Sequence, residues 1–188
     1  MKPSCNFYEL SQNGLIKEAN FLKSTNFDAR PKDKLINLIV IHSISLPPNK
    51  FGGTFIEDFF TNKLKSEDNP YFKKIKELKV SSHFLIKRNG ELIQFVSCKD
   101  RAWHAGESNW KNNINCNDFS IGIELEGSDL SPFENIQYMK LIALLKCLCK
   151  NYPINDIVGH NQIAPKRKTD PGPFFDWDLI NAENFYDQ

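Results

Sequence analysis

Three residues of the sequence carry the side chains with which proteins commonly hold a catalytic zinc ion. His42 directly follows a predicted strand, His160 directly follows another, and Asp170 comes ten residues after His160. Two imidazoles and one carboxylate complete such a site and leave its fourth position open to water. These residue types therefore predict a metal site, although a histidine at the end of a strand is more often a polar residue at the edge of a sheet.

Two charged residues suit the same chemistry. Lys168 lies two residues before Asp170, where a cation can stabilise a negative charge that develops on oxygen, but it also belongs to the basic run 166–168 and can be a solvated surface residue. Glu124 lies on the polar face of an otherwise apolar strand, and a buried carboxylate is costly unless it is partnered or functional. A catalytic group and a structural salt bridge are both open interpretations of Glu124.

The other two histidines have structural interpretations as well. Trp103 and His104 combine an aromatic plate with an imidazole, which suits the binding of a sugar, but a packed Trp beside a hydrogen-bonded His is at least as common. His83 lies within a predicted hairpin, and we expect it to be structural.

The candidate ligands depend on two strands and one loop for their positions. The apolar run 35–41 predicts a strand buried on both faces that ends at His42, and residues 154–158 predict a short strand that ends before His160. Because side chains at strand ends emerge at the edge of a sheet, both histidines are expected in a cleft. Asp170 follows in a Pro/Gly loop over 166–175, where the next residue, Pro171, restricts its backbone.

The remaining periodicity predicts further helices and strands. Asn89-Gly90 is a strong hairpin signal, and residues 120–126 alternate between apolar and polar side chains. Residues 1–34 carry little periodicity. The expected elements are strands at 80–87, 91–96 and 120–126, a helix to about residue 65 that opens with the capping box Thr54-x-x-Glu57, a short helix from Pro70 through Leu78, and a long helix over 132–151 that opens with a capping box at Ser131-Pro132-Phe133-Glu134.

Composition narrows the classes of protein to which the chain can belong. With 188 residues and 40% hydrophobic side chains, a single domain with its own core is expected. The formal net charge of +1 excludes strong nucleic-acid binding through counterion release. We expect no membrane partner, because no 18-residue apolar run occurs. The absence of a signal-peptide pattern and five cysteines without metal-type spacing favour a cytoplasmic protein with reduced thiols, which we expect to be a monomer.

Five separated blocks of sequence resemble one enzyme family. They are Val40–Pro48, Phe51–Gly53, Arg101–Gly106, Asn117–Gly127 and Lys168–Pro173. Together they resemble the zinc N-acetylmuramoyl-L-alanine amidases, and among these the cytoplasmic 1,6-anhydro-N-acetylmuramyl-L-alanine amidases of the AmpD type. The resemblance implies an α/β domain with a central mixed β-sheet flanked by helices, as in peptidoglycan recognition proteins. The amidase domain would cover residues 35–177, with 1–34 as a further segment of the same domain and 178–188 as a C-terminal tail.

The resemblance also implies a cofactor, a substrate and residue roles. The cofactor would be Zn²⁺, held by His42, His160 and Asp170, with Glu124 as the base that activates water and Lys168 as the group that stabilises the tetrahedral intermediate. The substrate would be an anhydro-muropeptide from peptidoglycan recycling, cleaved between its lactyl group and L-alanine. The expected substrate-binding residues are Ser43, Lys79, Trp103, His104, Asn115 and Leu125.

Three substrate-binding positions depart from the family pattern. Ser43 stands where Asn is frequent, and Lys79 and Asn115 stand where arginines that grip the stem peptide are usual. Lys79 lacks the bidentate fork that an arginine offers to a carboxylate, and Asn115 lacks the charge. We therefore expect substrate affinity or preference to differ from that of the family, while all five catalytic positions are kept.

Three alternatives to a recycling amidase remain. A metal-free peptidoglycan-binding module typically lacks part of the ligand set, whereas all three ligands are present here. A phage-type amidase acts on the intact wall, but no wall-binding module follows Trp177 in this sequence. A non-haem iron oxygenase also uses two His and one carboxylate, yet it gains nothing from Lys168.

Overall fold

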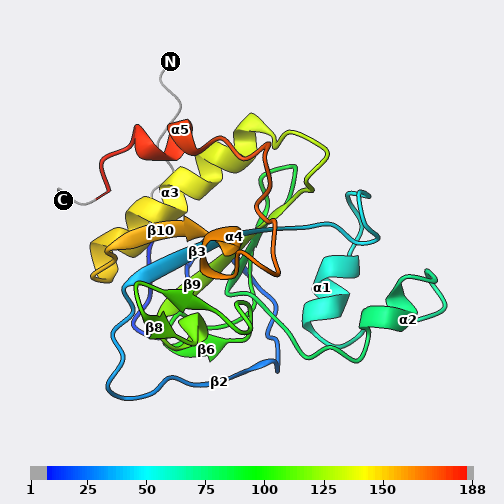
Figure 1. Ribbon diagram of the computed structural model, residues 1–188, viewed down its shortest axis with the longest axis horizontal. Helices are drawn as coiled ribbons and strands as arrows, with labels where there is room; N and C mark the ends of the chain where they lie inside the picture. Colours follow the sequence, from blue (N-terminus) through cyan, green and yellow to red (C-terminus); the bar gives the residue numbers. More distant parts are fainter. Residues whose placement is uncertain (1–7, 186–188) are drawn as a thin grey trace.

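A mixed six-stranded β-sheet forms the centre of the computed structural model, which describes residues 8–185 (Figure 1). Its strands, in spatial order, are β1 (Asn20–Phe21), β5 (Leu92–Gln94), β4 (Phe84–Ile86), β9 (Ser120–Glu126), β3 (Leu38–Ile44) and β10 (Asp156–Gly159). The helices are α1 (Phe55–Phe60), α2 (Phe72–Ile75), α3 (Asn135–Asn151), α4 (His160–Ile163) and α5 (Trp177–Asn181). This arrangement confirms the predicted α/β fold with a central mixed sheet flanked by helices.

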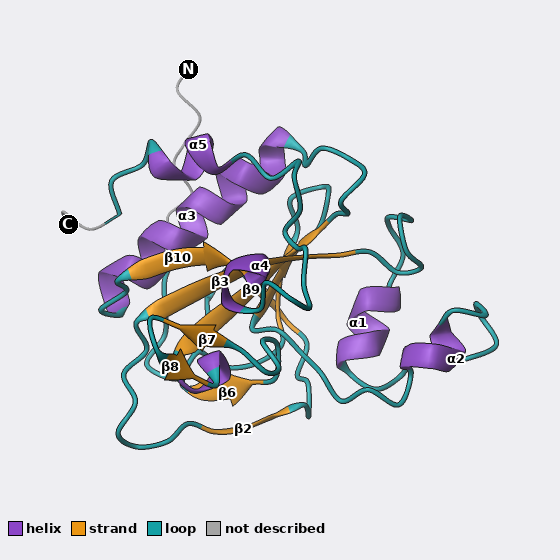
Figure 2. Cartoon of the chain, viewed as in Figure 1, coloured by secondary structure: helices purple, strands orange, loops and turns teal. Residues whose placement is uncertain are grey.

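Two small sheets complete the fold (Figure 2). Strand β2 (Phe27–Ala29) pairs with β6 (Asp100–Ala102), and β7 (Asn109–Trp110) pairs with β8 (Asn113–Ile114), followed by a 3₁₀ turn at Cys116–Asp118. No helix in the described range 8–185 is long and apolar enough to cross a membrane. The four cysteines within this range are free thiols, and Cys5 lies outside it.

Strand register brings two of the candidate residues together. Strand β9 runs parallel to β3 and to β4, and β3 runs parallel to β10, so the carboxyl ends of these four strands meet at one edge of the sheet. His42 of β3 is the register partner of Glu124 of β9. Because paired residues of neighbouring strands point to the same face, the two side chains lie side by side.

The two faces of β9 have different roles. Ile121, Ile123 and Leu125 pack in the apolar cluster that includes the inner face of α3, and the Leu125 side chain is 0% exposed. The alternating residues, which include Gly122 and Glu124, point to the opposite face. Leu125 therefore supports the core, and its side chain does not line the cavity to which Glu124 points.

The small sheets lie on the side of the central sheet opposite α3, and the segment that holds α1 and α2 lies beyond the carboxyl end of β3 (Figures 1 and 2). Phe59 and Phe60 of α1 and Phe72 of α2 pack with Leu85 of β4 and Ile93 of β5 in a second apolar cluster. This cluster forms one side of the cavity described below, since Phe59 and Phe60 also line that cavity.

Both predicted capping boxes are wrong. The Thr54 hydroxyl donates to Asp58 Oδ2 rather than capping α1, and Glu57 forms an ion pair with Lys87. Helix α1 ends at Phe60 rather than near residue 65. Helix α3 begins at Asn135, after a reciprocal cap between Glu134 and Gln137. For α1 the side chains assigned to the cap bind other partners, and for α3 the cap forms three residues later than the sequence pattern predicts.

Other boundaries shift by a few residues. The predicted strand at 35–41 is β3, which begins at Leu38 and continues through His42 to Ile44. The predicted hairpin is confirmed as β4 and β5, and the alternating strand is confirmed with its predicted bounds as β9. The short helix expected from Pro70 to Leu78 is α2, which covers only Phe72–Ile75.

Candidate metal centre

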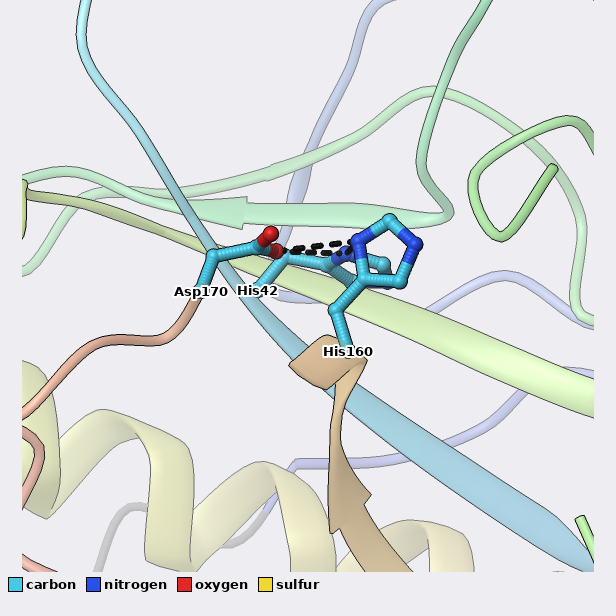
Figure 3. A group of neighbouring side chains, drawn as sticks. All are labelled: His42, His160 and Asp170. Atoms are coloured by element: carbon cyan, nitrogen blue, oxygen red, sulfur yellow. Dashed lines mark hydrogen bonds and ion pairs between the residues drawn. The ribbon is translucent and has the colours of Figure 1, made fainter. Parts of the chain in front are cut away.

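The three candidate ligands come together from three elements (Figure 3). His42 lies near the end of β3, His160 is the first residue of α4 directly after β10, and Asp170 lies on the loop that follows α4. His42 Nδ1 and His160 Nδ1 are 2.9 Å apart, and Asp170 Oδ2 lies 3.2 Å from the first and 3.0 Å from the second. Among the described residues this is the one group of His, Cys, Asp and Glu side chains with a geometry suited to a metal ion.

The outer nitrogen of His160 has a main-chain partner. His160 Nε2 lies 3.0 Å from the main-chain oxygen of Ala105, which can only accept a hydrogen bond. Nε2 therefore carries a proton, which leaves Nδ1 as the nitrogen that can ligate a metal ion at the centre of the group.

His42 has a comparable partner on its outer side. Its Nε2 lies 2.9 Å from His104 Nδ1, and His104 Nε2 lies 3.2 Å from the Ser120 hydroxyl. Burial lowers the pKa of His42 to about 4, and it lowers the pKa of His104 well below its usual range, so both rings are neutral at neutral pH. Ligation through His42 Nδ1 requires the proton on Nε2, where His104 Nδ1 can accept it.

This donor set fits a cation. With the outer nitrogens protonated, two Nδ1 lone pairs and a carboxylate oxygen converge within 3.2 Å of one another. Such a convergence of electron pairs is repulsive unless a positive ion lies among them. Neutral imidazole nitrogens with one carboxylate are the ligands of catalytic zinc sites, and outer hydrogen bonds to a carbonyl or a neighbouring side chain are the usual means of orienting them.

Glu124 lies beside this group without joining it. Its side chain is almost fully buried, with 8% of the residue exposed, and its Oε2 atom has no hydrogen-bond partner among the described residues. Burial, with a smaller contribution from the charge of Asp170, raises the pKa of Glu124 well above its usual value, and Lys168 opposes the rise. An unpartnered buried carboxyl with a raised pKa suits a group that exchanges a proton.

A cavity of about 170 Å³ connects these side chains. Its lining includes the three candidate ligands, Glu124 and Lys168, and three of the expected substrate-binding residues, Ser43, Trp103 and His104. The other lining residues are Ile44, Phe59, Phe60, Val80 and Ser81. The sequence predicts a wall of the cleft or a lid within residues 43–80, and Phe59 and Phe60 of α1 provide a wall from that segment.

Three expected substrate-binding residues lie outside this lining. Lys79 is exposed next to Val80 of the cavity wall, and its Nζ donates to Asn62 Oδ1 at 3.2 Å. Asn115 is exposed and has a left-handed backbone with φ of 59° before the 3₁₀ turn. Leu125 is buried in the core. Lys79 therefore remains near the rim, while the other two are not brought to the cavity.

Close packing against β9 explains a glycine in the middle of that strand. A Cβ atom at Gly122 would lie 2.5 Å from Cγ of His104, so the His104 ring occupies the space of the missing side chain. The main-chain N–H of Gly122 donates to Nδ1 of the fully buried His83. His83 thus holds the strand to the segment before β4, in agreement with its expected structural role.

Comparisons with known proteins give the same assignment as the blocks of sequence. The model of the family described as N-acetylmuramoyl-L-alanine amidase matches residues 31–173. The 1,6-anhydro-N-acetylmuramyl-L-alanine amidase AmpD of Haemophilus influenzae is 49% identical over 170 residues, which cover 89% of this chain and 92% of that protein.

Comparison with solved structures gives the same family assignment. The crystal structure of an AmpD derivative superposes with a TM-score of 0.89 at 47% identity and covers 92% of this chain and 98% of its own. The amidase AmiD from Escherichia coli, in complex with the substrate anhydro-N-acetylmuramic acid-L-Ala-D-gamma-Glu-L-Lys, superposes with a TM-score of 0.57 at 32% identity, over 81% of this chain and 58% of that one. The resemblance seen in the sequence and the predicted enzyme class are both confirmed: this chain belongs to the N-acetylmuramoyl-L-alanine amidase family.

Proposed function

We propose that this chain is a zinc-dependent amidase that cleaves the bond between the lactyl group of 1,6-anhydro-N-acetylmuramic acid and L-alanine in muropeptides. The observation that carries the proposal is the convergence of His42, His160 and Asp170 in the wall of a cavity that Glu124 and Lys168 also line. The related AmiD binds an anhydro-muropeptide of this kind, and the related AmpD enzymes are named for this activity.

Zinc is the ion that best suits these ligands. Two neutral imidazole nitrogens and one carboxylate, with thiols absent from the group, match catalytic zinc sites that keep one position free. When bound, zinc supplies a Lewis acid for the amide carbonyl and lowers the pKa of a coordinated water towards neutrality. His42, His160 and Asp170 would hold the ion, and His104 and the Ala105 carbonyl, as the outer partners of the two histidines, would orient their rings.

Glu124 acts as the general base and then as the general acid. Its carboxylate takes a proton from the attacking water and afterwards gives it to the L-alanine nitrogen, which must leave as an amine. The raised pKa makes Glu124 a stronger base than an ordinary carboxylate, and its unpartnered Oε2 leaves one oxygen free for this transfer.

Lys168 stabilises the charge that develops in the reaction. As water adds to the amide carbon, negative charge accumulates on the former carbonyl oxygen, and a fixed ammonium group nearby lowers the energy of that state. Lys168 lines the same cavity as Glu124, on the loop that also carries Asp170. The loop is held in place because Asn161 donates its main-chain N–H to the Asp170 carbonyl at 2.9 Å.

The rest of the cavity suits a muropeptide. Trp103 offers a flat face to the anhydro sugar, Phe59 and Phe60 provide an apolar wall, and Ser43 offers a hydroxyl beside the metal ligands. Lys79 at the rim can attract a carboxylate of the stem peptide as a point charge. We place the enzyme in the cytoplasm, where recycled muropeptides are soluble fragments.

A comparison of substrates tests this assignment. Purified, zinc-loaded protein is expected to release the peptide from a soluble anhydro-muropeptide, with turnover on insoluble peptidoglycan at least about 100-fold slower, because a small cavity admits a short fragment more readily than a glycan polymer. The measurement is peptide release from matched amounts of the two substrates. Comparable rates on both would favour the phage-type alternative and leave the amidase chemistry standing.

A further inference from the structure

One short segment orients both histidine ligands. In the segment 104–107, the His104 ring lies against His42 Nε2, and the carbonyl of the next residue, Ala105, accepts from His160 Nε2. The side-chain oxygen of Asn117 fixes the start of this segment, because it accepts from the main-chain N–H groups of His104 and Ala105 at 3.1 and 2.8 Å. The direction of the Ala105 carbonyl is therefore one determinant of where His160 Nδ1 points.

The backbone alone does not hold that carbonyl. Gly106 follows with φ of 59°, and glycine adopts this region as easily as its alternatives, so the peptide plane between Ala105 and Gly106 can rotate at little cost. A rotated plane would remove the acceptor from His160 Nε2. Some other contact must fix the plane.

Arg167 supplies this contact. Its Nη2 atom donates to the Ala105 carbonyl at 2.7 Å and to the Glu107 carbonyl at 2.9 Å, so one nitrogen binds the segment on both sides of Gly106. A Cβ atom at Gly106 would lie 3.0 Å from the same nitrogen, which shows that the guanidinium lies directly against the glycine. The Ala105 oxygen thus uses its two acceptor positions for Arg167 and His160.

We propose that Arg167 is a positioning residue for the metal centre, which acts on His160 through the Ala105 carbonyl. This inference rests on the proposed metal site and extends it to a residue that the sequence places only in a basic surface run. Arg167 also links two parts of the site, because it belongs to the loop that carries Lys168 and Asp170 and binds the segment that orients His42 and His160. Loss of an outer partner of a ligating histidine typically lowers metal affinity or activity by about 10- to 100-fold.

The test compares Arg167→Met with Lys166→Met. Both variants lose one positive charge, and the two positions are adjacent, so the long-range effect of the lost charge on a bound cation is matched. Methionine also keeps an unbranched apolar stem at each position. Arg167→Met is expected to weaken zinc binding by about 10- to 100-fold, measured by competition with a chromophoric chelator, whereas Lys166→Met changes it by less than about twofold. Arg167→Lys, which keeps a donor, is expected to lose less affinity than Arg167→Met.

A second readout does not depend on metal. In metal-free protein, nitrogen NMR of the histidine side chains should show a protected Nε2–H signal for His160 in the wild type and in Lys166→Met, and its loss by solvent exchange in Arg167→Met. Melting temperatures of the metal-free variants should agree within about 3 °C, which separates positioning from general destabilisation. Equal zinc affinity and an unchanged His160 signal in the two methionine variants would overturn the role of Arg167. A wild type that binds no zinc would refute the metal site itself, and the NMR comparison would still decide whether Arg167 holds the segment.

Discussion

Replacement of Glu124 by Gln is expected to lower kcat on an anhydro-muropeptide by about 10²- to 10⁴-fold while metal content stays unchanged. Glutamine keeps the size and one oxygen of the side chain, but its amide cannot take a proton from water at neutral pH. The carboxyl of Glu124 lies outside the ligand group, so the three ligands should still hold the ion. Steady-state kinetics and metal analysis on the same preparation measure both quantities.

Glu126 provides the matched control for this variant. It lies two residues further on the same strand and is also buried, but its carboxylate accepts from the main-chain N–H groups of Gly52 and Arg88 and does not line the cavity. Glu126→Gln should therefore lower the melting temperature and leave kcat within about threefold of the wild type. A Glu124→Gln protein with wild-type kcat would show that another group takes the proton and that the carboxylate is structural.

Replacement of His42 by Ala is expected to reduce metal content from about one ion per chain to nearly none and to bring amide cleavage down to background. The variant removes one of three ligands from a buried site, and His160 with Asp170 cannot hold the ion alone against a competing chelator. Metal content after dialysis against a weak chelator, with peptide release from the anhydro-muropeptide, measures the effect.

A second buried histidine controls for the loss of a ring from the core. His83 is fully buried, but its ring binds the main chain of Gly122 and Asp100 rather than the ligand group. His83→Asn should lower stability and retain the metal. Retention of a full equivalent of metal by His42→Ala would contradict the assigned ligand set.

The local sequence pattern was sufficient to predict those residues of the candidate site that lie on strands. The alternation of residues 120–126 gives both the bounds of β9 and the face on which Glu124 lies, because successive side chains of a strand point to opposite faces of the sheet. His42 and His160 were found from their place at the ends of apolar runs, where parallel strands bring side chains to one edge.

Contacts between segments that are far apart in the sequence could not be predicted from local sequence patterns. The contact of His104 with His42 and the hydrogen bond from Arg167 to the Ala105 carbonyl each join residues about 60 positions apart in the sequence. In addition, a basic run in the sequence does not distinguish a solvated arginine from one that binds two carbonyls. Strands β1 and β2 have only two and three residues, which is too short for any periodicity to be recognised.

The most direct test of a metal-dependent amidase is metal analysis combined with amide cleavage before and after chelation. The protein is expected to contain about one zinc per chain, to lose peptide release from the anhydro-muropeptide when the ion is removed, and to regain it when zinc is restored. Bound iron without amide cleavage would instead favour the oxygenase alternative. Full cleavage by protein from which all metal has been removed would contradict the role assigned to His42, His160 and Asp170.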